Sequence, residues 1–167
     1  MNLFITIETT GLDRDHDRIV ELAILKVDQE KKNKELFHRY FNPEMHLTED
    51  IVEIIKVDYN FLKKAPLFKE EVNSMLSFIG NSVLVSHNIE FVTSFINSEL
   101  KRCGKENLNN QMIDTLDYAR KLNTEDENTL EFLFKKYDFE KLNNNSIFKE
   151  LMVLPDLFRL LKNKSTN

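Results

Sequence analysis

The N-terminal run of alternating residues presents two polar side chains that are placed to do chemistry. Apolar residues at positions 3, 5 and 7 alternate with Phe4, Thr6 and Glu8, and this period of two predicts a β-strand. Thr6 and Glu8 therefore share one face of that strand, and Thr9-Thr10-Gly11 follows at once. A carboxylate there can bind a hard cation such as Mg²⁺ or remain a solvated surface charge. The turn-like sequence that follows favours a cleft position for Glu8.

Hydrophobic periodicity indicates the elements that position these side chains. Apolar runs over 19–27 and 35–41, joined by the polar segment 29–34, predict a hairpin. Apolar residues at spacings of 4, 3, 1 and 3 predict an amphipathic helix over 68–79, and 83–85 is a short apolar strand candidate. Further helices are expected over 88–103, 114–122, 128–137 and 146–161, the last kinked or divided by Pro155.

Composition restricts the class of protein. Three strands followed by helices alternating with short strands indicate an α/β fold with a mixed sheet, and 167 residues are most simply one domain, 1–167. The net charge of −5 argues against a strongly basic nucleic-acid coat, although an enzyme can grip a few nucleotides without one. A single cysteine, Cys103, fits a reducing compartment, and no apolar run approaches the roughly 20 residues of a membrane span. We expect a cytoplasmic protein with no membrane partner.

Two segments resemble the DnaQ-like (DEDDh) family of 3′→5′ exonucleases. The run 4–11 is similar to the family motif Asp-x-Glu-Thr-Thr-Gly, with Thr6 in place of the aspartate. The run 84–92 resembles Leu-Val-x-His-Asn-x-x-Phe-Asp, with Val92 in place of the aspartate. The resemblance spans nearly the whole chain and within the family is strongest to the exonuclease (ε) subunit of bacterial DNA polymerase III. It implies a ribonuclease-H-like exonuclease fold, a five-stranded mixed sheet flanked by helices.

The family's reaction is phosphodiester hydrolysis assisted by two divalent ions, held by four carboxylates beside a general-base histidine. Carried over by motif, Glu8 matches one carboxylate, while Thr6 and Val92 replace two others. In the third segment the best register places Asn145 at the base and Glu150 at the last carboxylate, and a shift by one residue would place Asn144 and Lys149 there. The resemblance thus implies catalytic and metal-binding remnants at Glu8 and Glu150 alone.

These replacements predict a domain that is catalytically silenced. Loss of a general base alone typically costs about 10²–10⁴ in rate, and a neutral threonine cannot bridge two metals as a carboxylate does. The expected role is a replication-associated binding or scaffold subunit, with a DNA polymerase catalytic subunit and a single-stranded DNA 3′ end as partners. The chain ends soon after the last predicted helix, without the tail by which the ε subunit holds its polymerase, which weakens the expectation of that partner. The alternative is a weak exonuclease using Mg²⁺ or Mn²⁺.

The resemblance also implies a set of nucleotide-binding residues. The implied residues are Thr9, Leu12, His87, Asn88 and Phe91.

Four residues also have a purely structural interpretation that follows from their place in the sequence. His87 follows a buried-type strand and could equally cap or pack there, and Glu150 could be a plain surface residue on a helix. Val92 shares an apolar stripe and is interpreted as a core residue. Asp114 is interpreted as the cap of the helix that begins at Thr115.

Overall fold

The fold is described from a computed structural model, covering residues 1–28, 33–123, 127–139 and 147–165. Its centre is a five-stranded sheet in the order β3-β2-β1-β4-β5. The strands are β1 (Asn2–Thr9), β2 (Ile19–Asp28), β3 (Asn33–Tyr40), β4 (Val83–Ser86) and β5 (Met112–Asp114).

Strand direction changes at the middle of the sheet. β1 pairs antiparallel with β2, and β2 pairs antiparallel with β3. β4 runs parallel to β1 and to β5. The sheet is therefore mixed, as predicted, and β1 lies at its centre with Glu8 near its carboxyl end.

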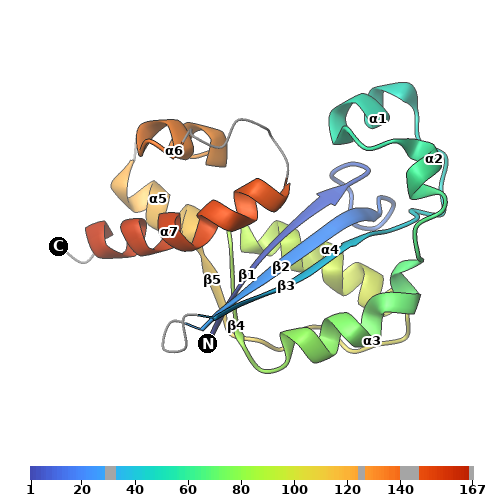
Figure 1. Cartoon of the computed structure of the whole chain (residues 1–167), viewed down its shortest axis with the longest axis horizontal. Coiled ribbons are helices and arrows are strands. Elements are labelled where there is room, and N and C mark those ends of the chain that lie inside the picture. Colours follow the sequence, from blue (N-terminus) through green and yellow to red (C-terminus); the bar gives the residue numbers. More distant parts are fainter. Residues whose placement is uncertain (29–32, 124–126, 140–146, 166–167) are drawn as a thin grey trace.

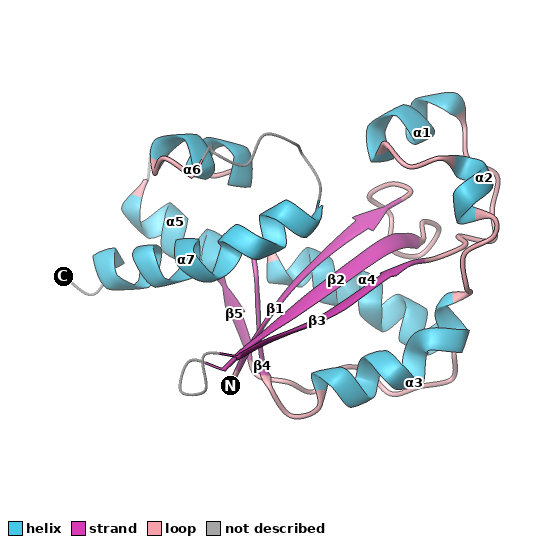
Figure 2. Cartoon of the chain, viewed as in Figure 1, coloured by secondary structure: helices cyan, strands magenta, loops and turns pink. Residues whose placement is uncertain are grey.

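Helices cover both faces of the sheet (Figures 1 and 2). The helices are α1 (Glu49–Ile55), α2 (Tyr59–Leu62), α3 (Phe68–Ile79), α4 (Ile89–Arg102), α5 (Thr115–Leu122), α6 (Leu130–Lys136) and α7 (Ile147–Ser165). The odd-numbered side chains of β1 pack with α3 and α4 in one core. Phe4, on the even face, packs with α5 and α7 in a second core.

Because the strand alternates, Thr6 and Glu8 continue the row that Phe4 begins on the α7 side. The arrowhead of β1 points between α1 on one side and the pair α6 and α7 on the other (Figure 1). A third, smaller core holds α1 and α2 against Val20 at the start of β2. The fold thus places a polar strand end beside two separate helical units.

Several helices and strands of the structure differ from those that hydrophobic periodicity predicts. α7 continues through Pro155 as one helix, so the expectation that Pro155 divides it was wrong, while a kink there stays a prediction. Pro155 has no N–H, so one backbone hydrogen bond of the helix is missing. Burial of the surrounding Leu154, Leu157 and Phe158 nevertheless stabilises the continuous helix. β5 and the one-turn helix α2 were not predicted, since elements of three and four residues carry no measurable period. Among the residues that the structure describes, no helix is long and apolar enough to cross a membrane.

Candidate functional site

Glu8 lies half-buried near the end of β1, where it faces other carboxylates. It pairs across the sheet with Glu21 of β2, just before a bulge at Glu8/Thr9. The pKa of Glu8 is raised to about 7, mainly by burial and then by the charges of Glu150 and Glu21, and the charge of Lys56 partly offsets this shift. Burial also raises the pKa of Glu150. The third-segment register that matched Glu150 therefore brings this residue close to Glu8, as the resemblance implied.

Neither of the two replaced motif positions carries a charge. Thr6 is half-buried on the same face as Glu8, opposite Ala23 of β2. Val92 is only 4% exposed and packs in the core beside Phe95 and Ile96, which confirms its interpretation as a core residue. Asn145 lies outside the residues that the structure describes.

This donor set does not fit a two-metal centre. Mg²⁺ and Mn²⁺ prefer several carboxylate or carbonyl oxygens around each ion. Within the described ranges, no group of three or more histidine, cysteine, aspartate or glutamate side chains is placed to hold a metal ion. The side chain at position 92 offers only hydrocarbon, and the one at position 6 a neutral hydroxyl. Glu8 and Glu150 are the carboxylates that could hold a cation here, and a single weakly held cation is the most that these two side chains fit.

A polar cluster on β2 and β3 was missed by sequence reasoning. Glu21 is 5% exposed, and its Oε1 lies 2.7 Å from Nε2 of His38. The pKa of Tyr40 is raised to about 12, mainly by burial and then by the charge and the hydrogen bond of Glu21. A glutamate in the middle of an apolar strand was the available signal, because a buried carboxylate needs partners.

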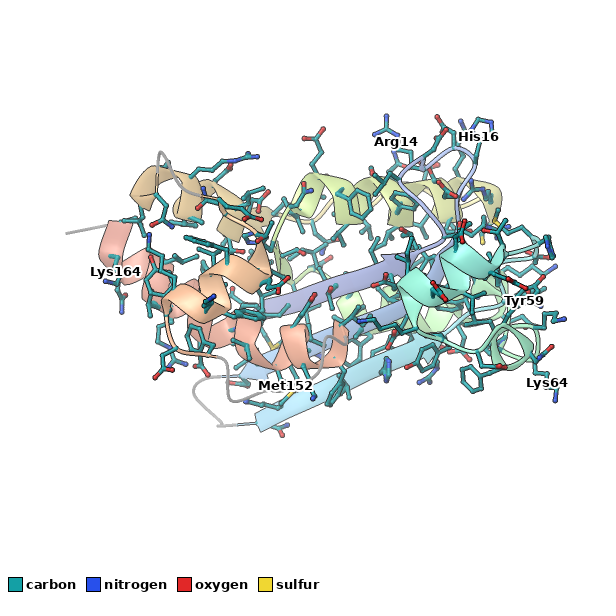
Figure 3. All side chains as sticks on the ribbon, turned by 90° about the horizontal axis from the view of Figure 1, so that it is seen from above. Arg14, His16, Tyr59, Lys64, Met152 and Lys164 are labelled. Atoms are coloured by element: carbon teal, nitrogen blue, oxygen red, sulfur yellow. The ribbon has the colours of Figure 1, made fainter. Side chains whose placement is uncertain are left out.

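Three of the expected nucleotide-binding residues line one cavity of about 650 Å³ between the β1–β2 loop and the start of α4. Leu12 is 86% exposed at its rim, and Asn88 and Phe91 come from the α4 side. The other lining residues are Asp13, Arg14, Asp15, Glu90 and Ser94. Arg14 and His16 stand out together from this loop beside α4 (Figure 3). The cavity is referred to below as the loop cavity.

The loop that forms one wall is fixed by a buried ion pair. Nε of Arg18 donates to Oε1 of Glu99 over 2.7 Å, and Glu99 is 1% exposed on α4. Arg102 lies 3.3 Å from the same carboxylate and donates to the carbonyls of Arg14 and Asp15. The Thr9 hydroxyl donates a hydrogen bond of 2.6 Å to the carbonyl of Gly11 and so stabilises the turn after β1. A side chain at Gly11 would collide with Asp17.

His87 has protein partners on both ring nitrogens. Nε2 lies 2.7 Å from the carbonyl of Asn128, and Nδ1 lies 2.9 Å from the Thr115 hydroxyl. Burial lowers the pKa of His87, so the neutral ring is favoured. His87 is not among the residues that line the loop cavity. The geometry therefore gives it a structural part, joining the end of β4 to α5.

Asp114 is a structural cap, as interpreted from the sequence. Its carboxylate accepts the backbone N–H groups of Asn88 and Ile89 at the start of α4, and of Leu116 in α5. Asn88 has a left-handed backbone with φ of 65°, and this conformation is held by the Asp114 bond. The cap thus sets the position from which Asn88 and Phe91 enter the loop cavity.

Comparison with known proteins assigns the family. A family model described as exonuclease, of the RNase T type, matches residues 3–144. The chain belongs to the exonuclease family. This DnaQ-like exonuclease domain is 38% identical over 136 residues to a PolC-type DNA polymerase III of Staphylococcus haemolyticus. It is 36% identical over 138 residues to the Staphylococcus aureus protein. Each match covers 80% of this chain but only 9% of the relative, so the domain spans a small part of the curated proteins it matches.

Solved exonuclease structures share the fold. Exonuclease X in complex with 5′ overhanging duplex DNA superposes with a TM-score of 0.72 at 18% identity, covering 100% of this chain and 94% of that one. E. coli exonuclease I in complex with a dT13 oligonucleotide gives a TM-score of 0.82 at 18% identity, covering 96% and 40%. The predicted ribonuclease-H-like exonuclease fold and the relationship to polymerase III exonucleases are both confirmed.

Proposed function

We propose that this chain is a catalytically silenced exonuclease domain that acts as a binding or scaffold subunit in DNA replication and holds a single-stranded 3′ end. The observation that carries the proposal is Val92. Its side chain is 4% exposed in the core at the position where the family motif has an aspartate. A two-metal mechanism needs a carboxylate there, and the neighbouring Thr6 cannot supply its charge.

The loop cavity supports retained binding of a nucleic-acid end. It combines an exposed apolar side chain, Leu12, with an aromatic ring, Phe91, and the amide of Asn88. Aromatic and apolar surfaces stack with bases of any sequence, and an amide can pair with a base edge or a sugar hydroxyl. The net charge of −5 limits phosphate contacts, so we expect weak binding with a shallow dependence on salt.

Binding is tested directly by fluorescence anisotropy of a 5′-labelled oligothymidine in EDTA. Phe91→Ala should weaken binding about 5- to 150-fold, the range for removal of one stacking ring. Met112→Ala is a matched control, because Met112 is a partly exposed apolar residue on β5, away from the loop cavity. Binding that is absent in the parent, or equal in the parent and Phe91→Ala, would refute retained end binding at the loop cavity.

A weak metal-dependent 3′→5′ exonuclease is the second candidate. It is favoured by the approach of Glu150 to Glu8, since two neighbouring carboxylates gain from a shared cation. If such a site works, Mg²⁺ or Mn²⁺ at millimolar concentration should raise the melting temperature, and Glu8→Ala should abolish the rise. A melting temperature that changes with neither Mg²⁺ nor Mn²⁺ would exclude a metal-dependent exonuclease.

A further inference from the structure

Four aromatic rings from three elements form a continuous row along β3. The Phe61 ring of α2 lies 5.2 Å from the ring of Tyr40, which lies 5.1 Å from that of His38. His38 in turn lies 6.0 Å from the Phe148 ring of α7. These four residues, Phe61, Tyr40, His38 and Phe148, are called the aromatic row. The row joins the α1–α2 unit to the start of α7 across the edge strand of the sheet.

The rings at the two ends of the row are open to solvent. Phe61 is 51% exposed and Phe148 is 38% exposed, while Tyr40 and His38 are half-buried between them. Single exposed apolar side chains are ordinary on protein surfaces, but contiguous groups mark binding surfaces. A connected row that ends in two exposed phenylalanines therefore fits a ligand that is itself flat and apolar.

The polar atoms of the two middle rings, those of His38 and Tyr40, are hydrogen-bonded within the protein. Glu21 accepts from Nε2 of His38 and from the Tyr40 hydroxyl, so its single buried carboxylate fixes both rings. Fixed side chains lose little conformational entropy when a ligand covers them. The exposed parts of these residues are thus ring surface, available for stacking.

The row is continuous with the candidate site. Glu8 pairs with Glu21 across β1 and β2, and Glu21 pairs with Tyr40 across β2 and β3. Neighbouring strands lie about 4.8 Å apart. The aromatic row therefore begins two strands from Glu8, on the same face of the sheet.

We propose that the aromatic row stacks the bases of single-stranded DNA whose 3′ end is held at the loop cavity. This inference rests on the proposed function, and it adds the path of the strand away from its end. Successive bases stack on protein aromatic rings regardless of sequence, which suits rings set 5.1–6.0 Å apart. Lys63 and Lys64, which follow Phe61 after Leu62, provide positive charge for the DNA backbone at that end of the row.

The test compares dT3 with dT12, both 5′-labelled, by fluorescence anisotropy in EDTA. The parent should bind dT12 more tightly than dT3. Phe148→Ala and Phe61→Ala should each weaken dT12 binding about 5- to 150-fold and leave dT3 unchanged. Phe148→Tyr should bind as the parent does, because it keeps the ring. Met112→Ala, which removes a side chain that is 37% exposed on β5, should have no effect on either oligonucleotide.

An oligonucleotide with a dT3 3′ end and an abasic 5′ segment separates stacking from charge. It keeps every phosphate of dT12 but lacks nine of its bases, and we expect it to bind the parent more weakly than dT12 does. Equal affinity of the abasic oligonucleotide and dT12, or row variants with a parental dT12 affinity, would overturn the row as a base-stacking surface. Absence of dT3 binding by the parent would instead contradict the proposed function.

Discussion

Glu150, in the first turn of α7, lies close enough to Glu8, near the end of β1, for its charge to raise the pKa of Glu8. The two residues are separated by almost the whole chain and meet because α7 packs over the even face of β1. Their approach leaves two half-buried carboxylates on the face of β1 that also carries Thr6. The negative charge of each therefore disfavours ionisation of the other.

Replacing Glu8 by glutamine should stabilise the fold at pH 8 and have little effect at pH 4.5. A raised pKa means that the folded state holds the proton more tightly, so stability falls as the pH rises from the ordinary carboxyl pKa of 4.5 to about 7, the pKa of Glu8 in the folded protein. The full shift would correspond to about 3 kcal/mol, and partial exposure reduces our expectation to about 1 kcal/mol.

That gain corresponds to about 2–4 °C in melting temperature for a chain of this size. It is measured by thermal unfolding in EDTA from pH 4.5 to 8. Glu106→Gln, at an exposed loop position, is the control and should shift nothing. A destabilised Glu8→Gln at pH 8 would show that the charged carboxylate is compensated in the fold.

Protonation of His87 should destabilise the fold on the acid side. Its pKa is lowered by burial, so the unfolded chain binds the proton more tightly, and this contribution to stability is lost as the pH falls below about 6.5. His87→Gln should remove this component and should cost about 1–3 kcal/mol at pH 7.5 through lost hydrogen bonds.

The measurement is the difference in unfolding free energy between parent and His87→Gln at pH 7.5 and pH 5. The difference should shrink on acidification. His46→Gln, at an exposed position, should give a difference that stays small at both pH values. A gap between parent and His87→Gln that widens in acid would contradict the structural part assigned to this ring.

The buried pair Arg18–Glu99 should fix the wall of the loop cavity. Glu99→Ala removes the 2.7 Å partner of Arg18, which keeps Glu44 at 3.4 Å, and should lower the free energy of unfolding by about 1.5–3 kcal/mol. Asp156→Ala breaks an exposed pair with Arg159 and should cost at most about 1 kcal/mol. Urea unfolding of both variants tests the contrast, and equal losses would show that the Arg18–Glu99 pair is dispensable.

Restoring the two missing carboxylates should create a metal site. Thr6→Asp with Val92→Asp puts an acid at both motif positions, one on the face of β1 that carries Glu8 and one at a core position that is 4% exposed. In EDTA the double variant should be destabilised by several kcal/mol, because an unpaired charge would be buried. Millimolar Mn²⁺ should recover much of this loss in melting temperature, while the parent gains little. A double variant indifferent to Mn²⁺ would contradict the assignment of positions 6 and 92.

Sequence reasoning reached the parts of the site that depend on local period. Alternation placed Thr6 and Glu8 on one face, the apolar stripe placed Val92 in the core, and Asp114 was correctly interpreted as a cap. Glu21 and His38 were missed because their contact depends on the register between β2 and β3, where a slip of one residue would reverse every side chain.

The aromatic row could not be predicted for the same reason. Phe61 and Phe148 come from elements distant in sequence, and only tertiary packing places both beside β3. The meeting of Glu8 and Glu150 was reached through the family motif, since no local period links a strand end to the first turn of a distant helix.

The central claim is that the fold remains while hydrolysis is lost. The most direct measurement is a time course of 3′-end-labelled single-stranded DNA with the parent and with Glu8→Ala, in Mg²⁺ and in Mn²⁺. We predict no degradation by either protein beyond the enzyme-free control. Degradation by the parent that disappears in Glu8→Ala would contradict the claim, because it would show that the remaining carboxylates still form a working site.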